Sequence, residues 1–87
     1  MPKIEKEIVV LNEQGLHARP AALFVQIASK YDSTVTVSKD GNCVNGKSIM
    51  GILMLGAEKN SKVTLCVEGD EAETLMNELE KFLTSNE

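Results

Sequence analysis

The chain has very few aromatic residues, and basic residues are outnumbered by acidic ones. Its 87 residues include no tryptophan, one tyrosine and two phenylalanines, and 9 basic residues stand against 13 acidic ones for a net charge of −4. Nucleic-acid binding favours a basic surface, and the binding of single strands also needs aromatic side chains on which bases stack. The composition therefore argues against direct binding of nucleic acid.

Long apolar runs and clustered metal ligands are also missing. No apolar segment approaches the roughly 20 residues of a membrane-spanning helix, and residues 1–5 lack the apolar core of a signal peptide. Cys43, Cys66 and His17, the only histidine, lie far apart in the sequence, unlike the close pairs of zinc sites. We therefore expect a cytoplasmic protein with no membrane segment, metal or other cofactor. Two reduced thiols are expected, with a disulfide as the alternative.

Apolar periodicity predicts alternating strands and helices within a single domain over residues 1–87. Strands are expected at 4–10, 34–38, 43–45 and 63–67, and helices at 18–29, 49–55 and 70–83. Asp40 and Gly41 form a two-residue hairpin signal between the second and third strands. Ser48 is a favoured N-cap for the second helix, and Asp70 with Glu73 has the spacing of a capping box for the third.

The resulting order, βαββαβα, predicts a two-layer α+β fold. Each strand has apolar residues on one face and polar residues on the other, so that only one face of the sheet needs a cover. Three amphipathic helices can supply that cover. We expect an open-faced sandwich in which a four-stranded antiparallel sheet is covered on one face by three helices.

The only histidine and the only arginine lie two residues apart, at His17 and Arg19, where a loop meets the first predicted helix. A helix start offers unpaired backbone N–H groups and a partial positive charge, and a guanidinium is suited to phosphate oxygens. A neutral imidazole nitrogen is a nucleophile near neutral pH. These features indicate a site that takes a phosphoryl group onto His17 and stabilises the anion. A surface histidine without chemistry is the alternative.

Ser48 is a second candidate for modification by phosphate. A phosphate on an N-cap serine lies at the favourable end of the helix dipole, so it leaves the helix folded while adding negative charge. Lys47 stands beside it and could assist a kinase or contact the phosphate. The capping role alone would also explain a serine at this position.

The second predicted helix is too apolar to bury every side chain. If Ile52 and Leu55 face the core, then Met50 and either Leu53 or Met54 must be at least partly exposed. Exposed methionine and leucine suit a surface that docks several partners. A helix sunk deeply into the core is the alternative.

Two segments resemble the signatures of HPr, the histidine-containing phosphocarrier family of the bacterial phosphoenolpyruvate:sugar phosphotransferase system. Residues 15–21, Gly-Leu-His-Ala-Arg-Pro-Ala, are similar to the active-site signature of the family. Residues 44–53, Val-Asn-Gly-Lys-Ser-Ile-Met-Gly-Ile-Leu, are similar to its regulatory-serine segment. The resemblance extends over essentially the whole chain, and the length and the order of elements agree with it.

The resemblance implies a phosphoryl carrier that does not catalyse a reaction independently. His17 would accept phosphate on Nδ1 from phosphorylated enzyme I, Arg19 would contact it, and IIA domains of sugar permeases would receive it. Ser48 would match the target of the ATP-dependent HPr kinase/phosphorylase, whose product acts with a catabolite-control transcription factor. We expect a monomer. The partner contacts that the resemblance implies are Ala18, Pro20, Lys47, Ile49, Met50 and Leu53.

Two positions depart from the usual pattern of the family. Gly46 stands where a larger residue usually precedes the Lys-Ser pair, which predicts a looser loop, and Met54 stands where serine is frequent. His17 argues against paralogues that keep the serine and lack the histidine. A regulatory or nitrogen-branch paralogue without a role in sugar uptake remains the first alternative, and an interaction module without phosphate chemistry is the second.

Overall fold

The computed structural model describes residues 2–85 and contains four strands and three helices. In chain order these are β1 (Lys3–Val9), α1 (Ala18–Ala28), β2 (Thr34–Lys39), β3 (Asn42–Asn45), α2 (Ile49–Leu55), β4 (Lys62–Glu68) and α3 (Ala72–Leu83). The order βαββαβα confirms the succession predicted from the sequence. None of the helices in this part of the chain is long and apolar enough to cross a membrane.

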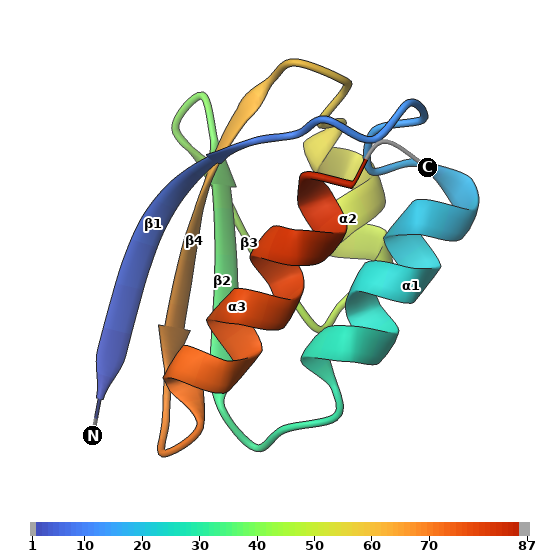
Figure 1. Cartoon of the computed structure of the whole chain (residues 1–87). Helices are drawn as coiled ribbons and strands as arrows, with labels where there is room; N and C mark the ends of the chain where they lie inside the picture. The colour runs from blue at the N-terminus through green and yellow to red at the C-terminus, as the bar shows by residue number, and fades with distance from the viewer. Residues whose placement is uncertain (1, 86–87) are drawn as a thin grey trace.

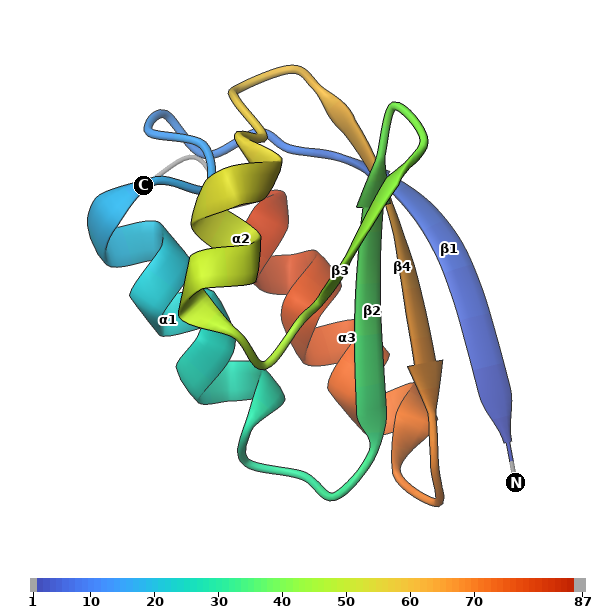
Figure 2. The same ribbon diagram turned by 180° about the vertical axis from the view of Figure 1, so that it is seen from behind.

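The four strands form one antiparallel sheet in the order β1-β4-β2-β3. The last strand in the chain, β4, therefore lies between β1 and β2, so that Val67 is paired with Ile4 on one side and with Val35 on the other. All three helices lie on one side of the sheet, and the other side is uncovered (Figures 1 and 2). The predicted open-faced sandwich is confirmed.

The core lies between the sheet and the helices. Alternate residues of the two central strands, Val35, Val37, Val63, Leu65 and Val67, are buried against the helix layer. The largest fully buried side chains of the helices are Phe24, Ile52, Leu75, Met76, Leu79 and Leu83. Each such side chain stabilises the fold by about 1.5–3 kcal/mol relative to its exposed state, so the helix layer is held mainly by burial.

The predicted turn and cap residues are confirmed at two places and wrong at a third. Asp40 and Gly41 both have positive φ, at 51° and 84°, as a type I′ hairpin turn requires. Ser48 is the N-cap of α2 and accepts a hydrogen bond from the Gly51 N–H. The capping box at Asp70 does not form, because the Ala72 N–H closes a turn onto the Gly69 carbonyl and α3 starts later. Its N-cap is Glu71, whose side chain makes no capping hydrogen bond.

The two cysteines are free thiols on the uncovered face of the sheet. Cys43 on β3 is paired with Ser38, and Cys66 on β4 is paired with Thr36, so β2 runs between them. Two strand spacings separate Cα atoms by about 9.6 Å, which exceeds the roughly 7 Å that a disulfide spans. The structure therefore favours reduced thiols over the disulfide.

Gly46 is a tightly packed residue, and the expectation of a looser loop is wrong. It is buried, and its N–H donates to the carbonyl oxygen of Val35 at 2.8 Å. A Cβ atom added at Gly46 would collide with the Cγ1 methyl group of Val35 and would lie 2.9 Å from the Val35 Cβ atom, closer than side-chain atoms normally approach. Glycine allows the turn before α2 to lie directly against β2.

We expect Gly46→Ala to lower the free energy of unfolding by about 1–3 kcal/mol, the usual cost of overpacking. Urea denaturation of the full chain measures this cost. In a Val35→Ala background the blocking methyl groups are gone, so the same substitution should cost less. Equal costs in the two backgrounds would show that the contact between these side chains is not the cause.

Candidate functional site

His17 is the N-cap residue of α1, and its side chain is exposed and does not cap the helix. The residue is exposed, its backbone is extended with φ −121° and ψ 157°, and its imidazole makes no capping hydrogen bond. The side chain of Leu16, directly before it, is fully buried, and the Leu16 N–H donates to the Ala57 carbonyl at 2.8 Å. The imidazole is therefore held at the surface by a neighbour that is fixed in the core.

The turn before His17 is closed by reciprocal hydrogen bonds. The Gly15 N–H donates to the Asn12 carbonyl at 3.1 Å, and the Asn12 side-chain amide donates to the Gly15 carbonyl at 2.8 Å. Gly15 has φ +65°, and a Cβ atom there would lie 2.6 Å from the Ala57 carbonyl oxygen. Only glycine fits this conformation and this close approach, so the turn defines where the helix begins.

Ala18 lies between the histidine and the arginine and has a strained backbone. Its φ is +49°, in the left-handed region that costs a residue with a Cβ atom about 1–2 kcal/mol. Strain of this kind is concentrated at functional sites, where the surrounding structure imposes it. The family resemblance implies only a partner contact for Ala18, and an alanine carries no sign of a positive φ.

Arg19 supplies a positive charge at the same helix start. It is exposed, the first turn of α1 has no acidic residue, and among residues 2–85 no carboxylate forms an ion pair with its guanidinium. The unpaired amides of a helix start and an unneutralised guanidinium favour an anion at this place. No group of three or more histidine, cysteine, aspartate or glutamate residues that could hold a metal ion occurs in the same described range.

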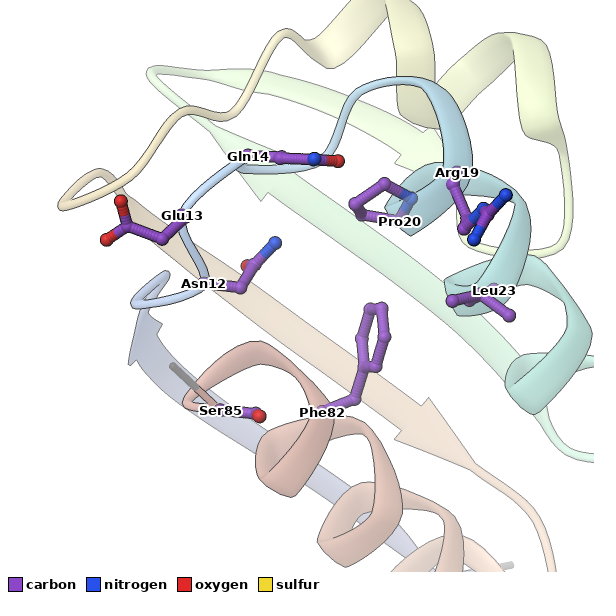
Figure 3. Close-up of a pocket in the computed structure, with 8 residues that line it drawn as sticks. All are labelled: Asn12, Glu13, Gln14, Arg19, Pro20, Leu23, Phe82 and Ser85. Carbon is purple, nitrogen blue, oxygen red and sulfur yellow. The ribbon is translucent and has the colours of Figure 1, made fainter. Parts of the chain in front are cut away.

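A hollow of about 400 Å³ lies beside Arg19 (Figure 3). Leu23 and Phe82 extend into it from α1 and α3, and the loop that contains Glu13 forms the opposite wall. Glu13 forms an ion pair with Lys59, which lowers the pKa of the carboxyl group through a hydrogen bond and the nearby charge. The hollow is thus lined by the apolar side chains of Leu23 and Phe82 together with Arg19. Its lining residues are Asn12, Glu13, Gln14, Arg19, Pro20, Leu23, Phe82 and Ser85.

Ser48 lies at the far end of α2 from His17. The two helices run in opposite directions, and the hydrogen bond between Leu16 and Ala57 joins the start of α1 to the end of α2 (Figure 2). The Ser48 hydroxyl oxygen accepts a hydrogen bond from the Gly51 N–H at 3.1 Å. A helix of seven residues is about 10 Å long, so the structure brings together His17 and Arg19 but leaves Ser48 about one α2 length away.

Lys47 has a structural contact that the sequence did not indicate. Its ammonium group donates to the Tyr31 carbonyl at 2.6 Å and joins the start of α2 to the loop after α1. The Tyr31 phenol donates to Glu78, which raises the pKa of Tyr31. Hydrogen bonds lower the pKa of Glu78, the one from Lys30 more than the one from Tyr31. The basic residue before Ser48 is therefore part of a link between α2, this loop and α3.

The exposed face of α2 is apolar. Ile52 and Leu55 are buried, whereas Ile49, Met50, Leu53 and Met54 are 43%, 62%, 37% and 78% exposed. The deeply sunk helix is therefore wrong, and the partly exposed helix is confirmed. Of the other two expected partner contacts, Ala18 is exposed but Pro20 is buried, which limits what Pro20 can offer a partner.

Sequence comparison gives a family match over nearly all of this chain. The family described as PTS HPr component phosphorylation site matches residues 4–85. The HPr-like protein Crh of Halalkalibacterium halodurans is 44% identical over 80 residues, which are 92% of this chain and 95% of that protein.

Two solved structures share the fold. Phosphocarrier protein HPr from Bacillus anthracis str. Ames superposes with a TM-score of 0.92 at 40% identity, covering 95% of this chain and 99% of that one. An HPr dimer from Thermoanaerobacter tengcongensis is 53% identical over 83% of each chain, with a TM-score of 0.69. With a family match from residue 4 to residue 85 and relatives of this similarity, the chain belongs to the HPr family, the phosphocarriers of the phosphotransferase system.

Proposed function

We propose that this HPr-family protein carries phosphoryl groups on Nδ1 of His17, receiving them from phosphorylated enzyme I and passing them to IIA domains of sugar permeases. The observation that carries the proposal is the exposed imidazole of His17, which makes no capping bond and precedes a helix turn with Arg19 and no acid. We further propose that it acts in the cytoplasm as a monomer with a single HPr-like domain over residues 1–87.

The proposed chemistry needs little from the carrier besides positioning. A nitrogen of neutral His17 attacks the phosphorus of the donor, a new N–P bond forms, and the bond between phosphorus and the donor breaks. Arg19 and the first amides of α1 balance the charge on the phosphoryl oxygens. The docked partner excludes water and aligns the groups, and the reactive N–P bond allows the next partner to take the phosphoryl group by the same step.

The exposed apolar face of α2 fits the docking of these partners, because it continues from the His17 end of the molecule. Phosphorylation of Ser48 by an HPr kinase/phosphorylase would add about two negative charges at the other end of this face. Ser48 is not next to the imidazole, so its phosphate would act by charge at the rim of the docking surface. The same modified form would be the one that binds a catabolite-control transcription factor.

A regulatory paralogue without a role in sugar uptake is the second candidate function, and the similarity to an HPr-like protein Crh is the observation that favours it. In that case Ser48 and the α2 face would carry the function, and transfer to a permease would be absent. The Thermoanaerobacter tengcongensis relative crystallised as a dimer. Sedimentation velocity of this chain would decide between one and two copies.

We expect wild-type protein to take up acid-labile, base-stable label from labelled phosphoenolpyruvate in the presence of purified enzyme I, and His17→Ala to take up none. Absence of label on the wild type, with active enzyme I, would overturn the carrier function.

Arg19→Ala should accept label about tenfold or more slowly at an unchanged melting temperature, because a charged hydrogen-bond partner is lost from an exposed site. Intact transfer with a large loss of melting temperature would contradict the role of Arg19.

We expect Ser48→Asp to accept the phosphoryl group more slowly than Ser48→Asn. Both side chains can cap α2, so the pair differs mainly in one negative charge. Initial rates of labelling by enzyme I measure the difference, and added salt should reduce it because the charge is exposed. Equal rates for the two variants would refute regulation by charge at this position.

A further inference from the structure

The three methionines within residues 2–85 occupy two opposite environments. Met50 and Met54 are 62% and 78% exposed, one helical turn apart on the outer face of α2, whereas Met76 in α3 is only 2% exposed. Residues four apart on a helix are neighbours, so the two exposed thioethers lie on the same surface. They share it with Ile49 and Leu53, which are also exposed.

We propose that Met50 and Met54 are a site of reversible oxidation, and that their sulfoxides slow phosphoryl transfer by making the docking face of α2 polar. The inference rests on the proposed function, because it needs partners that dock on this face. It names a chemical modification and a regulatory input for a surface already implicated in transfer.

The oxidant is a peroxide, and the reaction balances without another reagent. The thioether sulfur attacks one peroxide oxygen, the O–O bond breaks, and an S–O bond forms while water leaves. Sulfur is oxidised by two electrons and the peroxide is reduced by two. A methionine sulfoxide reductase reverses the step with a dithiol, which becomes a disulfide as the oxygen leaves in water.

The fold directs oxidation to these two sulfur atoms and separates them from the thiols. The core encloses Met76, so a peroxide reaches it only when the protein opens. Cys43 and Cys66 are paired with Ser38 and Thr36, respectively, whose side chains lie on the uncovered face of the sheet. Figures 1 and 2 show α2 on the opposite side of that sheet. Oxidation of a thiol therefore leaves the α2 face unchanged.

A sulfoxide at either position changes docking and not folding. Neither side chain belongs to the buried core, and the α2 cap formed by Ser48 uses backbone and hydroxyl groups. The sulfoxide oxygen is a hydrogen-bond acceptor that would lose water on docking against an apolar partner surface, which disfavours the complex. Two such groups on one small helix face give the modification a large effect.

The test uses the full chain with Cys43→Ser and Cys66→Ser, so that thiols do not consume the peroxide. Hydrogen peroxide is added until peptide mass spectrometry finds one extra oxygen on Met50 and on Met54, with Met76 unmodified. We expect the oxidised protein to accept phosphate from enzyme I about tenfold more slowly than the untreated protein. Treatment with methionine sulfoxide reductases and dithiothreitol should restore the rate, and the melting temperature should stay the same.

A Met50→Leu/Met54→Leu variant is the matched control, and each protein is compared with its own untreated sample. Peroxide should leave the rate of this variant unchanged, whereas Met76→Leu should lose rate as its parent does. Equal rates for oxidised and untreated parent, or an equal loss in the double variant, would overturn the oxidation site. Untreated parent that takes no label from active enzyme I would instead overturn the proposed function, and the inference with it.

Discussion

The placement of the candidate site depends on one anchor, the Leu16 side chain in the core and its N–H donating to the Ala57 carbonyl. This anchor joins the chain before α1 to the chain after α2, so that the start of one helix and the end of the other form one surface. Gly15 makes the close approach possible because a Cβ atom would collide with the same carbonyl. His17, Ala18 and Arg19 follow within three residues, and their positions are consequences of where Leu16 is held.

Helices α1 and α2 contribute different groups to this surface. The start of α1 offers an imidazole, a guanidinium and free amides, which are suited to an anion. The outer face of α2 offers exposed apolar side chains, which gain by being covered. Ser48 caps the far end of α2, so charge added there meets a docked partner without touching the imidazole. The proposed chemistry, docking and charge-based regulation thus occupy neighbouring places on a small protein.

The fold was largely predictable from local pattern, because alternation, helical periodicity and turn residues act over short stretches of sequence. His17, Arg19 and the Ser48 cap were found for the same reason, and the family signatures reinforced them. The positive φ of Ala18 was not predictable, since an alanine gives no sign of this conformation. The structural contact of Lys47 was not predictable because its partner, the Tyr31 carbonyl, lies in another part of the chain.

Two further features could not be predicted from local pattern: the packing of Gly46 against Val35 and the start of α3 at Ala72. Each depends on contacts with other segments of the chain. A sequence motif shows which residue is present, and it does not show which residues pack against it. The sequence therefore indicates which residues are candidates for the site, and the structure is needed to show the environment of each.

The strand order carries a consequence for how the protein is made. Because β4 lies between β1 and β2, the sheet has no continuous core until residues 62–68 have left the ribosome. Until then β1 lacks β4, its neighbour in the described sheet. Pairing between residues so distant in sequence is a late and comparatively slow event in folding. The four-stranded sheet, and with it the described fold, is therefore complete only after β4 has been synthesised.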